Sequence, residues 1–250
     1  MIGDALSVAP IFIVFCRVSG CIMIAPGLSS DRVPVRARLY IAIAITLALG
    51  PALVDDLSAS FVHAGPSSLA AAIMSESLIG VFLGLLARLY FFALETMLTG
   101  VAMTIGLGNI FNSAILDAES APQLSSFLVL CAVMMIFVTD QHLQITRGLY
   151  LSYDAAPITQ APDAEALRRE LANILMQSHL LALRICSPFF LFGFLVNLAF
   201  GFLARLTPQV PVYFVSSPFV IVLGLYLMAI MSKDFLVAFT THFGSWLTRG

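Results

Sequence analysis

The feature that most constrains this chain is a set of long windows in which no residue is charged. Two of them, Ser120–Thr139 and Ile185–Ala204, are 20 residues long, and a third, Leu206–Ser232, has 27 residues. About 20 apolar residues are enough for a helix to cross the hydrocarbon core of a membrane. The windows therefore predict an all-α protein whose helices face lipid or other protein over most of their surface.

The composition excludes several classes of protein. Hydrophobic residues make up 60% of the 250 residues and charged residues only 10%, against about 25% charged residues in soluble domains. An ordinary cytosolic enzyme and a disordered chain are therefore excluded. The net charge of −2 provides no basic surface for a phosphate backbone, so we expect no nucleic acid among the partners.

Several of the candidate spans are imperfect. Leu39–Val54 is short and contains Gly50-Pro51, where we expect it to end, and Pro208, Pro211 and Pro218 interrupt the longest window. Counting windows still predicts about six membrane spans. Interrupted windows of this kind suit helices buried against other subunits better than helices surrounded by lipid. The candidate spans are Ala5–Leu28, interrupted by Arg17, and Leu69–Ala87, which continues past Glu76, together with the charge-free Leu39–Val54, Thr96–Leu107, Ser120–Thr139, Ile185–Ala204, Leu206–Ser232 and Phe235–Thr248.

Six charged residues lie inside these apolar windows or at their edges. A charge at the bilayer centre costs at least ~2.5 kcal/mol, so each of them needs an explanation. Arginines near helix ends can extend to the membrane interface. Alternatively, the charges pair within the chain or with neighbouring subunits, and breaking a buried pair costs about 3–5 kcal/mol. The six residues are Arg17, Glu76, Arg88, Glu95, Arg184 and Arg205.

The segment Gly100–Leu116 carries no charge, yet its glycine, asparagine and serine residues make it a poor helix. Irregular backbone cannot face lipid, because its N–H and C=O groups would lack partners. The segment is therefore either a buried turn or a loop that lines a pore. Earlier in the chain, Gly80 and Gly84 form a GxxxG pattern, which predicts a close crossing of two helices.

Nothing in the sequence predicts catalysis or a cofactor. The four cysteines form no CxxC pair, the four histidines are scattered, and no GxSxG, Walker A or HExxH motif occurs. We therefore expect no enzymatic activity, no catalytic residue and no metal site. The most polar stretch, Asp140–Glu170, is expected to contain a surface helix that begins at Asp163 and carries a Glu165–Arg169 pair.

Motifs spread along the chain resemble one known family. The most specific block is Asn197-Leu-Ala-Phe-Gly201-Phe-Leu-Ala-Arg205-Leu-Thr-Pro208-Gln209, which Pro218 and Gly224 follow. The other motifs are Arg17-Val-Ser-Gly20, Ala25-Pro26, Val33-Pro34-Val35-Arg36, Pro51, Leu78-Ile79-Gly80 with Gly84, and Gly100–Gly108.

From about Phe15 to Met231 the chain is similar to the FliR family of flagellar type III secretion export-gate proteins, which is homologous to the SctT-type injectisome subunit. The chain departs from the family pattern at Asp140-Gln141-His142, at Asp117-Ala118 and in its short C-terminal tail.

The resemblance implies an all-α integral membrane protein of bent helical hairpins, in which a FliP-like part at 1–179 is fused to a FliQ-like hairpin at 180–250. It implies a non-enzymatic subunit that completes a ring with FliP and FliQ homologues in the bacterial inner membrane. The assembly would be located in the flagellar basal body, and part of it would lie above the membrane plane. Homologues of FlhB and FlhA, unfolded export substrates and membrane lipids are the other implied partners.

By position, the family's pore plug corresponds to residues 106–117. Apolar side chains such as Ile110, Phe111, Ile115 and Leu116 at a narrow constriction exclude water and ions, and Gly106 allows the backbone to bend. The predicted gating residues are Gly106, Leu107, Gly108, Asn109, Ile110, Phe111, Asn112, Ser113, Ile115, Leu116 and Asp117. The structural residues of the family motifs are Pro26, Pro34, Gly80, Gly84, Asn197, Gly201, Pro208 and Pro218.

Two alternative functions remain open at this point. A subunit of a virulence type III secretion gate would share the same motifs. A small-solute transporter would carry inverted repeats and a polar site at the membrane midplane, and no two halves of this sequence have a matching pattern.

Overall fold

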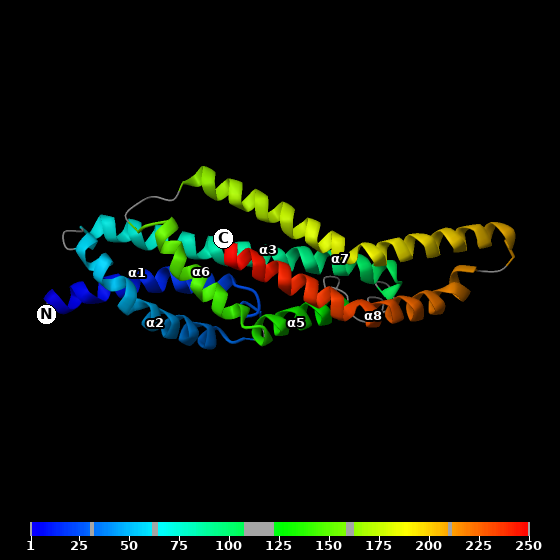
Figure 1. Ribbon diagram of the computed structural model, residues 1–250, viewed down its shortest axis with the longest axis horizontal. Helices are drawn as coiled ribbons and strands as arrows, with labels where there is room; N and C mark the ends of the chain where they lie inside the picture. The colour runs from blue at the N-terminus through cyan, green and yellow to red at the C-terminus, as the bar shows by residue number, and fades with distance from the viewer. Residues whose placement is uncertain are drawn as a thin grey trace. The chain divides into compact units, whose positions relative to one another are not determined.

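The structure is a computed structural model that describes residues 2–30, 33–61, 65–107, 123–158, 163–209 and 212–249. Within these residues the regular structure is helical, without a strand, so the all-α prediction is confirmed (Figure 1). The helices are α1 (Ile2–Ile24), α2 (Val35–Phe61), α3 (Pro66–Thr104), α5 (Gln123–Val138), α6 (Gln141–Ala155), α7 (Ala164–Leu206) and α8 (Val212–Arg249).

Three helices are longer than the charge-free windows that predict them. α3, α7 and α8 have 39, 43 and 38 residues, so Arg88, Glu95 and Lys233 lie inside continuous helices. Arginine, lysine and glutamate are good helix formers, and a charge therefore ends an apolar window without ending a helix. Among the described residues, four helices are long and apolar enough to cross a membrane, or five if the bent pair α5–α6 is one span. The described residues thus contain fewer candidate spans than the six or so that counting windows predicts.

Proline does not end the helices where the sequence predicts an end. α2 continues past Gly50-Pro51 to Phe61, and Pro218 lies inside α8. Pro208 does lie in the connection between α7 and α8, and Pro211 is outside the described residues. Proline breaks are thus fewer than the sequence predicts, because a helix with many other hydrogen bonds tolerates the loss of one.

Pro188 in α7 shows how such a loss is compensated. A helical proline leaves the carbonyl four residues earlier without its N–H partner. Here that carbonyl belongs to Arg184, and the hydroxyl of Ser187 donates to it at 2.8 Å. The side-chain bond replaces the missing backbone bond, and α7 continues without a break.

The beginning of α7 bears on two sequence predictions. The Asp163 carboxylate accepts the backbone N–H of Glu165 at 2.9 Å, which confirms that Asp163 opens α7. On the surface of that helix Glu165 pairs with Arg168 at 3.4 Å, one residue before the predicted Arg169. Spacings of three and four residues both bring side chains together on a helix, so the sequence pattern does not distinguish them.

α3 continues through Gly100 to Thr104, so the prediction of irregular structure is wrong for these residues. The helix ends just afterwards, where Gly106 has φ +82° and its N–H donates to the carbonyl of Met103 at 3.1 Å. A left-handed glycine is a common helix terminator. The rest of the predicted plug, 108–117, lies outside the described residues.

The chain divides into two compact units, and each is built from segments that are distant in sequence. Unit 1 contains Met1–Tyr90, Thr139–Ile174 and Trp246–Gly250, and unit 2 contains Phe91–Val138 and Leu175–Ser245. These units describe packing. The predicted division into 1–179 and 180–250 concerns likeness to two other families, and it stays a prediction.

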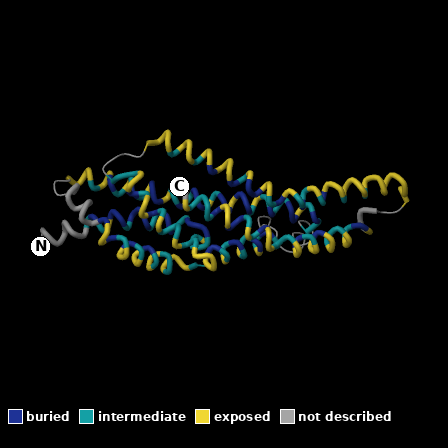
Figure 2. The backbone as a smooth tube through the Cα atoms, viewed as in Figure 1, coloured by how far each residue is buried: buried dark blue, intermediate teal, exposed yellow. Residues whose placement is uncertain are grey.

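The core of unit 1 is built around α1. Val14, Val18 and Ile22 follow one another at four-residue spacing and pack against residues of α2 and α6, chiefly Ala42 and Tyr153. Their spacing places all three on one helix face. Most of the described part of α1 is accordingly buried or half-buried (Figure 2).

Unit 2 has an aromatic core but a largely exposed apolar surface. The ring of Phe91 meets Phe239 and Phe243 edge to face, with centroids 5.1 and 5.7 Å apart. By contrast, the second half of α7 and the first half of α8 are mostly exposed in Figure 2. We call this the hairpin surface: Leu191, Phe194, Leu195, Leu198, Phe202, Leu203 and Leu206 of α7, with Val215, Phe219, Val222, Leu223, Tyr226 and Ile230 of α8. An exposed apolar area of this size faces lipid or another protein.

Candidate functional site

Unit 1 contains a buried ion pair between Arg17 of α1 and Glu76 of α3. The Nε of Arg17 donates to Oε2 of Glu76 at 2.5 Å, and Nη2 donates to Oε1 at 2.9 Å. Neither side chain is exposed. Two parallel bonds between a guanidinium and a carboxylate form the strongest kind of charged hydrogen bonding. The structure thus brings together two of the six charged residues singled out in the sequence.

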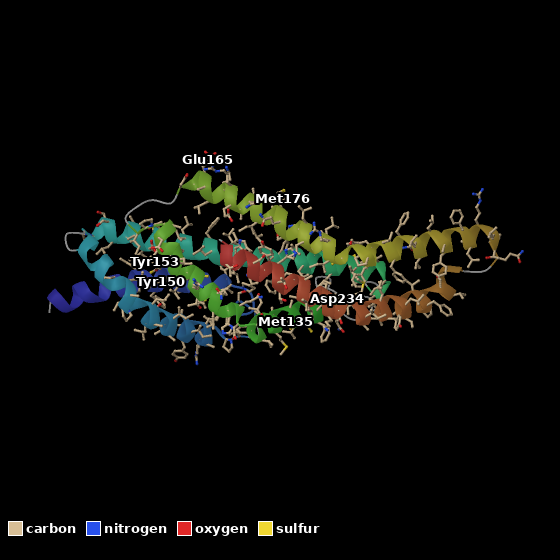
Figure 3. The ribbon with its side chains drawn as sticks, viewed as in Figure 1. Met135, Tyr150, Tyr153, Glu165, Met176 and Asp234 are labelled. Atoms are coloured by element: carbon tan, nitrogen blue, oxygen red, sulfur yellow. The ribbon has the colours of Figure 1, made fainter. Side chains whose placement is uncertain are left out.

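The remaining donors of Arg17 bind the C-terminal end of α6. Nη1 donates to the hydroxyl of Ser152 at 3.0 Å, and Nη2 donates to the backbone carbonyl of Ala156 at 2.8 Å. The guanidinium carbon lies 3.9 Å from the ring centroid of Tyr153, which Figure 3 labels on α6. A single side chain of α1 therefore connects three helices of unit 1.

Glycines make this connection possible, because α1 and α3 touch through their backbones. A Cβ atom on Gly80 would overlap the backbone carbonyl of Arg17. One on Gly84 would lie 2.7 Å from the carbonyl oxygen of Cys21, and one on Gly20 would lie 2.8 Å from that of Ser77. The close crossing that the sequence predicts at Gly80 and Gly84 is present. It holds α1 near enough for Arg17 to reach Glu76, one helical turn from Gly80.

The other four charged residues are not brought together. Arg88, Arg184 and Arg205 are exposed, Glu95 is half-buried, and none of them forms an ion pair with a described residue. Arg184 lines a cavity of about 220 Å³ in unit 2. Pairing of these residues with neighbouring subunits, or their extension to the membrane interface, stays a prediction.

The second feature lies in unit 2, where the last residues of α3 pack against two glycines just before the predicted plug, 106–117. A Cβ on Gly193 of α7 would overlap the side chain of Thr104, and one on Gly224 of α8 would lie 2.7 Å from the Cβ of Ile105. Two glycines thus leave room for the last residues of α3, and Gly106 follows with its left-handed backbone. We call this arrangement the α3 anchor.

Sequence reasoning missed Gly193 and Thr104, and it treated Gly224 only as part of a family motif. The available signal was a glycine inside an apolar helix, where it is about 1 kcal/mol less favourable than alanine. That signal does not distinguish a glycine at a close contact from one without a neighbour, because Gly201 of the same helix has open space where its Cβ would be.

The remaining motif residues have structural positions. Pro34 precedes α2, and its carbonyl accepts the N–H of Ala37 at 2.9 Å. The amide of Asn197 donates to the carbonyl of Gly193 at 2.8 Å. Pro26 is buried in the turn after α1, whereas Pro208 and Pro218 are exposed. The residues that the structure describes include no group of histidine, cysteine or acidic side chains that is suited to a metal ion.

The anchor predicts a difference between two glycines of α7. Gly193→Ala should lower the free energy of unfolding by about 1–3 kcal/mol, because the methyl group displaces Thr104. Gly201→Ala should have no cost, or stabilise the helix by up to about 1 kcal/mol. Thermal unfolding of the purified protein in detergent measures both. Equal stability of the two variants would show that Gly193 does not hold the end of α3.

The chain was compared with known proteins. Residues 8–246 match the family described as bacterial export proteins, family 1. Three relatives are each called flagellar biosynthetic protein FliR. The one from Caulobacter vibrioides is 26% identical over 92% of this chain and 91% of its own length. Those from Pectobacterium carotovorum and Escherichia coli K12 are each 27% identical, over 90% and 85% of this chain and 84% and 80% of their own lengths. The chain therefore belongs to family 1 of the bacterial export proteins, the family that includes the FliR proteins.

Proposed function

We propose that this chain is a non-enzymatic subunit of a flagellar type III export gate in the bacterial inner membrane. Its relatives are named as flagellar biosynthetic proteins and match it over 85% to 92% of its length. Their names favour the flagellar system over virulence secretion. Four helices of suitable length and composition support the membrane location.

The observation that carries the proposal is the α3 anchor. Thr104 and Ile105 are held against Gly193 and Gly224, directly before the segment 106–117. A fixed starting point is what a short pore plug needs, because the segment after it must return to one position each time the pore closes. In this proposal the apolar side chains of the segment exclude ions from the closed pore. Gly106 provides a point at which the backbone can change direction.

The hairpin surface supports assembly with other subunits. Large apolar side chains such as Phe194, Phe202 and Phe219 are 62–64% exposed within the chain. Arg205 is exposed among them, beside Leu203 and Leu206. We propose that FliP and FliQ homologues cover this surface and complete a ring with the chain, and that FlhA and FlhB homologues belong to the same gate. Unfolded flagellar proteins would be the exported substrates.

Co-purification with FliP and FliQ homologues tests this assembly. We expect the chain to be recovered with both homologues at a fixed stoichiometry after extraction in mild detergent. Arg205→Glu should reduce the recovered complex about tenfold, equivalent to about 1.4 kcal/mol. Arg168→Glu is the matched control, because Arg168 is an exposed arginine near the polar beginning of the same helix.

Normal assembly of Arg205→Glu would mean that Arg205 only extends to the membrane interface. A chain that binds a small solute and is recovered without either homologue would contradict the gate and favour a transporter.

The plug is tested by deleting Asn109–Ile115. The deletion should raise the permeability of the membrane to small ions, since the apolar constriction is lost. Influx of a small ion or dye is measured in cells that assemble the variant complex. Co-purification at the parent level is the control for assembly. Unchanged permeability in cells with normal assembly would contradict the role of this segment as a plug.

A further inference from the structure

Unit 1 contains a cavity that the ion pair and the helix crossing do not use. It has a volume of about 310 Å³ and is partly open. Its walls come from α1, α3, α6 and the last turn of α8, including Leu83 of α3 and Trp246 of α8. The indole of Trp246 packs on the ring of Tyr90 with centroids 5.1 Å apart, which fixes one wall. The volume is within the range of small-molecule sites in proteins.

The lining of this cavity favours a hydrocarbon over water. Ser152 contributes a hydroxyl, but this group donates to the carbonyl of Leu149 at 2.6 Å and accepts from Arg17 at 3.0 Å. Thr248, the second hydroxyl residue of the lining, has an interaction partner as well. A buried water needs two to four polar partners. Ser152 and Thr248 are the two hydroxyl residues of the lining and both already have partners, so the lining suits an apolar occupant better than an ordered water.

Gly148 in the middle of α6 is the second observation. It lines the cavity, and a Cβ built on it has no heavy atom within 4 Å. Unlike Gly80 and Gly193, it is not required by a neighbouring helix. A glycine at a mid-helix position is about 1 kcal/mol less favourable than alanine. Unlike Gly201, which also has open space, Gly148 lines a cavity, and its missing side chain leaves room there for an occupant.

The surface beside the opening carries a positive charge. Arg147 is exposed, and among the described residues no ion pair involves it. One turn later on the same face is Leu151, which lines the cavity and is still 48% exposed. The cavity is therefore continuous with an exposed apolar surface, and a cation lies next to it. A membrane phospholipid combines these two properties, because it carries a hydrocarbon chain and an anionic phosphate.

We propose that this cavity binds one acyl chain of a membrane phospholipid and that Arg147 holds the phosphate of the same molecule. The lipid chain fills the space beside Gly148 and contacts Leu83 and Leu149. The proposal depends on the membrane location of the chain and is independent of a role in export.

Photolabelling tests the proposal on the full chain, purified with any subunits that accompany it. The probe is phosphatidylglycerol with a diazirine near the end of one acyl chain, in vesicles of phosphatidylethanolamine and phosphatidylglycerol. We expect labelling within 145–155 of the parent protein. Gly148→Leu fills the cavity and should reduce this labelling at least about fivefold, roughly the effect of 1 kcal/mol. Arg147→Gln should reduce labelling without filling the cavity, and Arg168→Gln, at an exposed arginine of α7 that does not line the cavity, is the matched control and should stay close to the parent.

Leu83→Phe narrows the cavity from α3 and should give the same loss, so the test does not depend on the folding of Gly148→Leu. Equal labelling of 145–155 in the parent and in the filled variants would overturn the proposal. So would labelling confined to the hairpin surface. Labelling of 145–155 in the chain alone but not in its complex with FliP and FliQ homologues would assign the cavity to a protein helix and would equally overturn the proposal.

Discussion

The structure of unit 1 depends on an arginine that has no access to solvent. Arg17 brings a guanidinium group into the core of unit 1, and an unpaired charge in such surroundings is strongly unfavourable. It is tolerated because Glu76, Ser152 and Ala156 all meet it. Sliding α1 by one residue would separate these partners, so the pair determines the register of α1 against α3 and α6. A buried pair of this kind adds little net stability, but removal of one partner is costly because it leaves the other charge buried alone.

Both units use glycine to bring helices together, but for different purposes. In unit 1, Gly80 and Gly84 allow backbone contact between α1 and α3, and the contact brings a charge to its partner. In unit 2, Gly193 and Gly224 make room for side chains at the end of α3. Packing through small residues is the usual way in which apolar helices associate, because the hydrophobic effect does not distinguish a lipid tail from a leucine. The helices of unit 1 surround the cavity proposed as a lipid site, and those of unit 2 hold the residues just before the segment proposed as the plug.

Much of the fold could be predicted from the sequence, because it follows from local patterns. The helical class followed from the charge-free windows, the helix start from Asp163, and the close crossing from Gly80 and Gly84. The helix lengths could not be predicted, since Arg88 and Glu95 end an apolar window but are good helix formers. Arg17 and Glu76 could be selected as unusual charges. Their pairing could not be predicted, because the two residues are 59 positions apart and meet only where α1 crosses α3.

The roles of the glycines inside helices could not be predicted from the sequence either. Gly148, Gly193 and Gly201 are all glycines inside helices, yet one faces a cavity, one receives Thr104 and one faces open space. Only the packing of other helices around them separates these roles. The family assignment does not depend on them, because it rests on motifs distributed from one end of the chain to the other.

The central claim is that Arg17 and Glu76 act as one unit, and a double-mutant cycle tests it most directly. The variants are Arg17→Met, Glu76→Leu and the two combined, with thermal unfolding of the purified protein in detergent as the measurement. Each single change should cost about 3–5 kcal/mol, because it leaves a buried charge alone, and the combination should recover most of that loss. The exposed Arg168–Glu165 pair, treated in the same way, should show a coupling below about 1 kcal/mol. Additive losses for Arg17 and Glu76, with no recovery in the double variant, would contradict the claim.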